Sequence, residues 1–317
     1  MNRMRILFEK LQIKTVARFP FTRVLISRFA VSGIQYHPLL HTIAGILGVL
    51  MLPLAVAVSV ADRIRGRFAI GQATVILTTR CNLRCIHCST LIPYSAHPQN
   101  MDTALVLEDI EKLFEAVDHI YAFQISGGEP FLHPDLATVI EKVLSIGRIK
   151  TLNVVTNGGV LPSAEALRAL QDRRVKVQIS GYPKHLVPQR ARFIETLEEH
   201  SIAFGISADQ KWKYLGDRTY VARSEDERKE LLSLCAFSLC HHMFDGKYFI
   251  CSFAAHGMDA GIIAVDPNDF VDVRNLDTAT TRAQLQHLLC RPYTSACDYC
   301  LGNTHFSKTI PAAEQLS

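Results

Sequence analysis

Apolar runs of strand length alternate with helix-like segments along the middle of the chain. The predicted strands fall at residues 74–79, 119–125, 150–155, 174–179 and 202–206. Segments with the apolar period of an amphipathic helix lie between them, at residues 104–117, 134–147, 163–171 and 187–199. Alternation at this spacing is typical of parallel β–α–β units, so the sequence predicts an α/β fold, either a doubly wound sheet or a barrel. In barrels, the chemically active residues gather at the C-terminal ends of the strands.

Cysteine is unusually frequent in this chain, with nine cysteines in 317 residues. Because nine is an odd number, the cysteines cannot all be paired in disulfides. The first long apolar stretch starts near residue 43, too late for a signal peptide. We therefore expect a reducing cytoplasmic environment, in which clustered cysteines serve metal or redox chemistry.

Three of the cysteines follow the first predicted strand in one short loop, Cys81-Asn-Leu-Arg-Cys85-Ile-His-Cys88. Thiolates are soft ligands that select iron–sulfur clusters or zinc. Three protein ligands would leave one iron of a [4Fe–4S] cluster free to bind a substrate or a cofactor. The alternative is a zinc knuckle that is completed by His87 or by a distant ligand.

A Gly127-Gly128-Glu129-Pro130 turn follows the second predicted strand. Its two glycines would let a ligand approach the backbone closely, and its glutamate could accept a hydrogen bond from an ammonium group. At the end of the strand after a three-cysteine loop, this turn is a specific signal. The combination resembles the radical S-adenosylmethionine (SAM) superfamily, over roughly residues 70–305.

The resemblance implies a partial (β/α)6 barrel, similar to a TIM barrel, in which Cys81, Cys85 and Cys88 hold a [4Fe–4S] cluster. It implies that the residues from Gly127 to Pro130 bind the amino group of SAM. In this superfamily an electron from the cluster cleaves SAM to a 5′-deoxyadenosyl radical, which abstracts hydrogen from the substrate. The electron would come from a reductant of the flavodoxin or ferredoxin type.

Three polar residues match further positions at which relatives contact the ribose or the carboxylate of SAM. They are Thr156 and Asn157, after the third predicted strand, and Ser180, after the fourth. The alternative for Asn157-Gly158 is a simple turn, and Ser180 could instead satisfy only the backbone.

The other six cysteines lie in a turn-rich region near the C-terminus: Cys235, Cys240, Cys251, Cys290, Cys297 and Cys300. The Cys297-Asp-Tyr-Cys300 pair is spaced to present two thiolates to one metal, and Asp245-Gly246 predicts a hairpin turn before Cys251.

Four of these cysteines resemble the auxiliary-cluster domain of the SPASM and twitch subfamilies, which implies a second [4Fe–4S] cluster. The implied ligands are Cys240, Cys251, Cys297 and Cys300, with Cys235 as a possible replacement for Cys240. A zinc site built from the same four cysteines is the alternative, and Cys290 is expected to be a buried thiol.

The N-terminal part of the chain differs in charge from the rest. Residues 1–67 carry ten Lys and Arg against two Asp and Glu, whereas the remaining residues have a net charge of −4. A slightly acidic remainder of the chain argues against nucleic acid as the main partner.

Residues 43–61 are nineteen uncharged residues, close to the length that spans a membrane. Basic flanks and Pro53 favour a monotopic anchor, and a buried helix of a soluble protein is the alternative.

The sequence thus predicts three parts: a helical membrane-associating segment at residues 1–68, a radical SAM partial barrel at 69–222, and a small cysteine-rich SPASM/twitch-like domain at 223–317. We expect a radical SAM enzyme in the cytoplasm, attached to the cytosolic face of the inner membrane through residues 1–67. Its expected substrate is a sugar- or lipid-linked biosynthetic intermediate. The alternatives are a peptide-modifying enzyme of the same superfamily and, from another class, a non-catalytic membrane-tethered iron–sulfur electron carrier.

Overall fold

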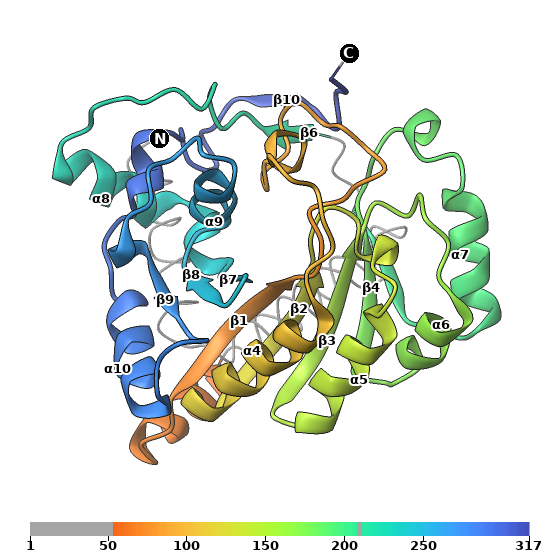
Figure 1. The fold of residues 1–317 in the computed structure, drawn as a ribbon, viewed down its shortest axis with the longest axis horizontal. Helices are drawn as coiled ribbons and strands as arrows, with labels where there is room; N and C mark the ends of the chain where they lie inside the picture. The colour runs from red at the N-terminus through yellow and green to blue at the C-terminus, as the bar shows by residue number, and fades with distance from the viewer. Residues whose placement is uncertain (1–52, 208–210, 317) are drawn as a thin grey trace.

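A computed structural model describes residues 53–207 and 211–316, and its fold is an α/β sheet with helices packed against it (Figure 1). The described strands are β1 (Ala69–Ile76), β2 (His119–Ser126), β3 (Ile149–Thr156), β4 (Val175–Ile179), β5 (Phe204–Ile206), β6 (Lys211–Lys213), β7 (His242–Phe244), β8 (Lys247–Phe249), β9 (Phe270–Asp272) and β10 (Thr309–Pro311). Helices that lie wholly within the described residues are α4 (Thr103–Ala116), α5 (Leu136–Ile146), α6 (Ala164–Leu170), α7 (Arg190–Glu199), α8 (Glu225–Leu234), α9 (Ser252–Asp259) and α10 (Thr278–Leu288). Short 3-10 turns complete the connections.

The predicted alternation of strands and helices is confirmed from β1 to β5. These five strands are parallel neighbours in the order β5-β4-β3-β2-β1. The helices begin where capping residues allow it: the side chain of Asp102 accepts a hydrogen bond at the start of α4, and Ser163 does so at the start of α6. The carboxyl ends of the strands therefore meet at one edge of the sheet, which is where a functional site is expected.

The sheet continues beyond β1 into the cysteine-rich region. Strand β7 pairs with β1 in parallel, and β8 and β9 follow in antiparallel order. The turn at Asp245 and Gly246, both with positive φ, forms the predicted hairpin between β7 and β8. The hydrophobic core is also continuous, because side chains such as Phe123 and Phe253 belong to the same cluster of buried residues. Residues 223–316 thus share the sheet and the core of the barrel-like part, a connection that we did not predict.

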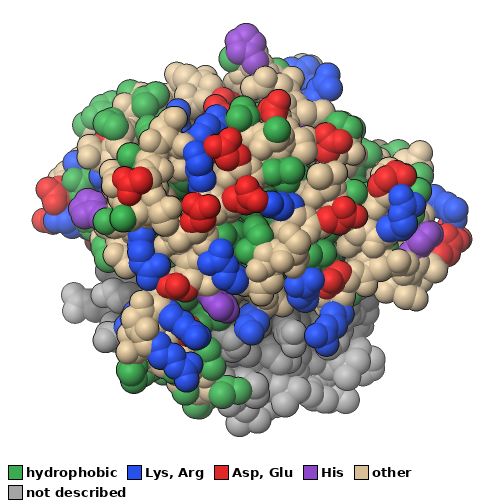
Figure 2. All heavy atoms as spheres, turned by 60° about the horizontal axis from the view of Figure 1, so that its bottom comes forward, with side chains coloured by type: hydrophobic (Ala, Val, Ile, Leu, Met, Phe, Trp, Pro, Cys, Tyr) green, Lys and Arg blue, Asp and Glu red, His purple; other side chains and the backbone are tan. Residues whose placement is uncertain are grey.

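The described end of the N-terminal segment is helical over residues 53–64. Its Ala55 and Ser59 side chains are buried, and the Tyr121 hydroxyl of β2 donates a hydrogen bond to the buried Asp62 carboxylate. Most of the predicted anchor lies outside the described residues. Among the helices of the described ranges, none combines the length and the apolar character needed to cross a bilayer. Figure 2 shows that acidic and basic side chains are intermixed over one face of the molecule.

Candidate active site

A cavity of about 180 Å³ lies at the carboxyl ends of β1 to β4. All three cysteines of the first cluster face it, together with residues that follow the next three strands. The predicted site residues that line it are Cys81, Cys85, Cys88, Gly127, Gly128, Thr156, Asn157 and Ser180. The predicted residues Glu129 and Pro130 do not line it. With Trp212, which also lines it, the fold thus brings five separate segments of the chain to one cavity.

The three loop cysteines are free thiols that suit a soft metal centre. Burial and the neighbouring thiols raise the pKa of Cys81 to about 12 and that of Cys85 to about 11. A cationic centre would reverse this effect, since a coordinating thiol is deprotonated. The backbone N–H of Leu83 donates to the Cys81 sulfur at 3.4 Å, a contact that favours a negatively charged sulfur. This donor set fits the [4Fe–4S] cluster that the sequence implies.

The two glycines after β2 allow the backbone of that turn to cross the start of the cysteine loop. The Gly128 N–H donates to the carbonyl of Thr78 at 2.8 Å, and the Glu129 N–H donates to the carbonyl of Arg80 at 2.9 Å. A Cβ atom on Gly127 would lie 2.4 Å from the Thr78 carbonyl oxygen. We expected the glycines to admit a ligand, and the structure shows that they also admit the neighbouring backbone. This contact joins the cysteine loop rigidly to the end of β2.

Glu129 is completely buried behind the cavity. Its Oε1 atom accepts hydrogen bonds from the Thr156 hydroxyl at 2.8 Å and from the Phe131 N–H at 3.2 Å, and its Oε2 atom accepts from the Asn157 N–H at 2.9 Å. We expected this carboxylate to face the amino group of SAM. In the structure it fastens the end of β3 to the turn after β2 through these three hydrogen bonds, two from backbone N–H groups and one from the Thr156 hydroxyl. Glu129 thus positions Thr156 and Asn157, and its contact with SAM stays a prediction.

The buried carboxylate makes stability depend on pH. Burial raises the pKa of Glu129 from 4.5 to about 7, although its three hydrogen-bond donors oppose the shift. The folded state therefore binds this proton more tightly than the unfolded chain does. The resulting contribution to the free energy of unfolding is full below about pH 4.5 and is lost as the pH rises through about 7, a change of about 3 kcal/mol.

We expect Glu129→Gln to remove this part of the pH dependence, because an amide does not titrate. Urea unfolding of the wild type and of the variant, measured at several pH values across this window, checks the expectation. The amide also places an N–H₂ group among backbone donors, which lowers stability at every pH. Only the change in the free energy of unfolding with pH therefore tests the role of Glu129. An equal change in the wild type and in the variant would contradict it.

Asn157 links the end of β3 to the cysteine loop. Its Nδ2 atom donates to the Asn82 side-chain oxygen at 2.7 Å, and its own side-chain oxygen accepts from the Gly159 N–H at 2.7 Å. The same Nδ2 atom lies 3.9 Å from the Cys81 sulfur. The residue thus does more than form a turn, since it joins two walls of the cavity.

The C-terminal segment supports the cysteine loop from the other side, and no sequence signal pointed to it. The Ile86 N–H donates to the carbonyl of Glu314 at 2.8 Å, and the Leu316 N–H donates to the carbonyl of Arg84 at 2.7 Å. The side chain of Gln315 accepts from the Arg84 N–H at 2.7 Å and donates through Nε2 to the Cys85 sulfur at 3.2 Å. Residues about 230 positions apart thus form an antiparallel bridge that places an N–H donor on one predicted cluster ligand.

We expect Gln315→Ala to make the reduction potential of the loop cluster more negative, by at most roughly 50 mV. A hydrogen bond to a ligand sulfur stabilises the reduced, more negative cluster, so its loss disfavours reduction. Potentiometric titration followed by electron paramagnetic resonance measures the change. Glu314→Ala is the matched control, since the contact of that residue uses only its backbone carbonyl. Equal potentials for the wild type and the Gln315 variant would show that the contact does not reach the cluster.

Four cysteines of the second set line a small buried pocket of about 20 Å³: Cys235, Cys251, Cys297 and Cys300. The predicted ligand Cys240 is not among them, and its thiol lies 3.8 Å from the carbonyl of Ala236. Cys235 takes that place, since α8 ends directly before it and turns its sulfur inward. Cys290 is exposed, so our expectation of a buried thiol was wrong.

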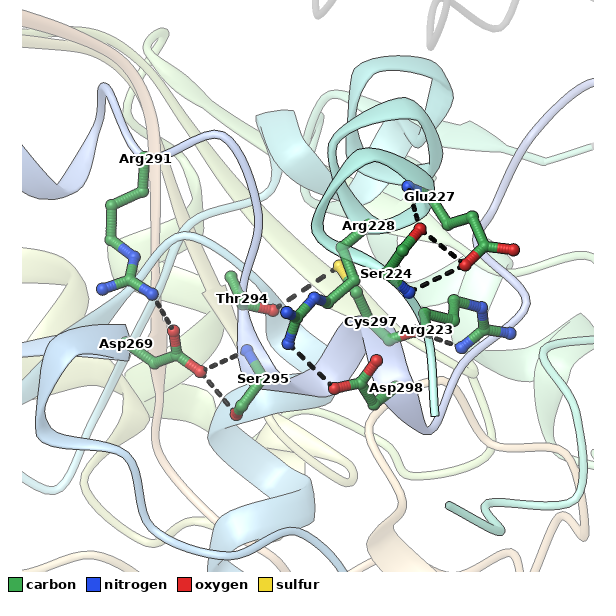
Figure 3. Close-up of polar contacts among 10 residues, drawn as sticks. All are labelled: Arg223, Ser224, Glu227, Arg228, Asp269, Arg291, Thr294, Ser295, Cys297 and Asp298. Carbon is green, nitrogen blue, oxygen red and sulfur yellow. Dashed lines mark hydrogen bonds and ion pairs between the residues drawn. The ribbon is translucent and has the colours of Figure 1, made fainter. Parts of the chain in front are cut away.

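Backbone donors and ion pairs stabilise this second pocket. The Asn303 N–H donates to the Cys235 sulfur at 3.3 Å, and the Gly302 N–H donates to the Cys300 sulfur at 3.2 Å. Figure 3 shows the turn that carries Cys297, where Arg228 pairs with Asp298 at 3.1 Å and Arg223 donates to the Cys297 carbonyl. Burial raises the pKa of Cys300 to about 12, so four neutral thiols would fill the pocket without a cation.

Within residues 53–207 and 211–316, no three His, Cys, Asp or Glu side chains form a group that could hold a single metal ion. Each ligand of a [4Fe–4S] cluster binds a different iron, so its cysteine sulfurs need not converge on one point.

Comparison with known proteins matches residues 75–200 to the radical SAM superfamily. The chain is 32% identical over 113 residues to the GTP 3′,8-cyclase of Pelotomaculum thermopropionicum, covering 35% of this chain and 34% of that protein. It is 26% identical over 178 residues to the pre-heme d1 synthase of Dinoroseobacter shibae, covering 54% of this chain and 43% of that protein. The chain thus spans less than half the length of these curated relatives. Among solved structures, BtrN in complex with AdoMet and 2-DOIA is 15% identical, with a TM-score of 0.42 and coverage of 75% of this chain and 98% of BtrN. Residues 75–200 therefore form a domain of the radical SAM superfamily of enzymes.

Proposed function

We propose that the chain is a radical SAM enzyme that acts on a sugar- or lipid-linked biosynthetic intermediate. The observation that carries the radical SAM chemistry of this proposal is the one cavity that the three loop cysteines share with the carboxyl ends of β2, β3 and β4. When bound there, a [4Fe–4S] cluster and SAM supply a 5′-deoxyadenosyl radical through reductive cleavage of SAM, with an electron from a flavodoxin- or ferredoxin-type reductant.

The residues around the cavity bind and orient the cofactor in this proposal. Cys81, Cys85 and Cys88 hold the cluster through their sulfurs. The turn from Gly127 to Pro130, whose two glycines line the cavity, meets the amino group of SAM. Thr156, Asn157 and Ser180 offer hydroxyl and amide groups to the polar parts of the cofactor.

The test is SAM cleavage by anaerobically reconstituted protein. With dithionite as the reductant, the protein should bind SAM and release 5′-deoxyadenosine. Reconstituted protein that binds iron but neither binds nor cleaves SAM would instead favour the electron-carrier alternative. A peptide-modifying enzyme would cleave SAM as well, and deuterium transfer from labelled peptides to 5′-deoxyadenosine would identify it.

A second [4Fe–4S] cluster occupies the pocket of Cys235, Cys251, Cys297 and Cys300 in this proposal. Support comes from the four thiols that line one buried pocket and from the two backbone N–H groups that donate to their sulfurs. The iron content of two variants shows which of these two cysteines is the ligand. Cys235→Ala should lose this cluster, whereas Cys240→Ala should retain it. Zinc in the second pocket of protein purified without oxygen would exclude the second cluster.

The chain associates with the cytosolic face of the membrane through residues 1–67 in this proposal. The described end of that segment supports it, since Leu54 is 52% exposed and Ile64 is 82% exposed, on a helix whose opposite side is buried. Nearby Arg63 and Arg65 would meet anionic headgroups. Co-sedimentation of the full chain with vesicles that contain anionic lipid tests this, and a full chain that stays in the supernatant would refute it.

A further inference from the structure

The inner face of the sheet carries polar residues below the candidate active site. Side chains alternate between the two faces of a strand, so residues two positions apart share a face. Ser126 and Val155 line the cavity, and Gln124 and Asn153 precede them by two positions on β2 and β3. These two side chains therefore lie on the cavity side of the sheet, about 7 Å farther into the barrel.

The register of the strands extends this pair into a row. Thr74 of β1 lies opposite Gln124, Gln124 lies opposite Asn153, and Asn153 lies opposite Lys176 of β4. On the other side of β1, Thr74 lies opposite His242 of β7. We call these five residues the polar row. The polar row crosses five neighbouring strands, and none of its five side chains is hydrophobic.

The side chains of the polar row lack partners within the protein. In the described parts of the chain, the side chains of Gln124, Asn153 and Lys176 have no hydrogen-bond or ion-pair partner, and their polar atoms are not fully buried. The Thr74 hydroxyl and the Nδ1 atom of His242 are buried and also without a partner. A buried polar group without a partner costs roughly 1–3 kcal/mol, and a hydrophobic residue at such a position avoids this cost. This cost applies to Thr74 and His242. The polar atoms of Gln124, Asn153 and Lys176 are accessible and can meet a bound molecule, so a polar row of this kind next to a cofactor cavity points to a ligand that satisfies it.

Lys176 indicates the charge of that ligand. Its side chain is half-buried, and burial alone lowers its pKa to about 8, because no carboxylate lies close enough to oppose the effect. The ammonium group is still mostly protonated at neutral pH. An unpaired ammonium group in a partly closed site is stabilised by an anion such as a phosphate or a carboxylate.

The amide and hydroxyl groups indicate the remaining chemistry. Gln124 and Asn153 each present both donors and an acceptor, which is what a ligand with several hydroxyl groups requires. We propose that the polar row binds a polyhydroxylated small molecule that carries a phosphate or carboxylate group, with the anion at Lys176 and the hydroxyl groups at Gln124 and Asn153. The proposal deepens the proposed function, on which it rests for the SAM beside this molecule.

Calorimetric titration of the full-length reconstituted protein, saturated with SAM, tests the proposal. The probes are glucose 6-phosphate, glucuronate and glucose, so that the first two distinguish a phosphate from a carboxylate. We expect at least one charged probe to bind at millimolar concentration or below, and at least tenfold more tightly than glucose. Lys176→Met should weaken that binding about ten- to hundred-fold, whereas Lys176→Arg should retain most of it.

Lys150→Met is the matched control, because Lys150 lies exposed at the start of β3, away from the cavity end. It should leave probe binding unchanged. The proposal is overturned if no charged probe binds, if glucose binds equally well, or if Lys176→Met has no larger effect than Lys150→Met. Titrations without SAM distinguish a failure of the polar-row proposal from a failure of the proposed function. Lys176-dependent probe binding in a protein that does not bind SAM would refute only the proposed function, and normal SAM binding without probe binding would refute only the role of the polar row.

Discussion

Replacement of Cys81, Cys85 and Cys88 by Ala should abolish the formation of 5′-deoxyadenosine and lower the iron content from about eight to about four atoms per chain. The three sulfurs face the same cavity, so their removal leaves that cavity without a soft ligand. The second pocket shares no residue with the first and should keep its iron. Iron analysis and chromatographic detection of 5′-deoxyadenosine after incubation with SAM and dithionite measure both effects.

Cys290→Ala is the control for this result. Its thiol is exposed and lines neither cysteine pocket, so the variant should keep both the iron and the cleavage of SAM. If the triple variant retained SAM cleavage, the loop cysteines would not hold the reactive cluster. A wild-type content near four irons would instead remove the second cluster from the proposal and leave the first intact.

Replacement of Gly128 by Ala should lower the free energy of unfolding by about 3 kcal/mol or more and impair SAM binding. The added Cβ atom would lie 2.1 Å from the carbonyl oxygen of Arg80 and 3.0 Å from the Cβ atom of Cys81. Neither backbone can move away easily, since the Glu129 N–H is also bonded to the Arg80 carbonyl. The cysteine loop and the turn after β2 would therefore separate, and the wall of the cavity would shift.

Gly261→Ala is the control for the general cost of adding a methyl group to glycine. Gly261 has a φ of +67° but no atom within 4 Å of an added Cβ, so only backbone strain of about 1–2 kcal/mol is expected. Urea unfolding and SAM titration compare the two variants. A Gly128 variant as stable as the Gly261 variant, with unchanged SAM affinity, would show that the tight crossing of the two backbones is not needed.

The parallel part of the fold could be predicted from the sequence because its signals are local. Apolar periodicity over a few residues distinguished β2 and α4. The same holds for the cysteine loop and for the turn from Gly127 to Pro130. Each is one contiguous segment after a strand, and parallel neighbouring strands bring such segments to one edge.

The direction of single side chains at that edge was not predictable in the same way. Glu129 belongs to the predicted turn, but its carboxylate faces Thr156 and Asn157 of another strand and not the cavity. Nothing in a contiguous motif states whether a glutamate turns toward a ligand or toward the neighbouring backbone. That choice depends on which donors the next strand presents.

The sequence by itself determined the alternation of strands and helices, the three-cysteine loop and the glycine-rich turn, since each depends on residues close together in the chain. Only the tertiary structure decided that β7 pairs with β1, that Gln315 donates to Cys85, and that Cys235 replaces Cys240 in the second pocket. It also decided the polar row, because Gln124 and Lys176 reach one row only through the register of three strands. The physical reason is that these contacts join residues far apart in sequence, and strand register and packing select them from many pairings that composition and local periodicity allow equally.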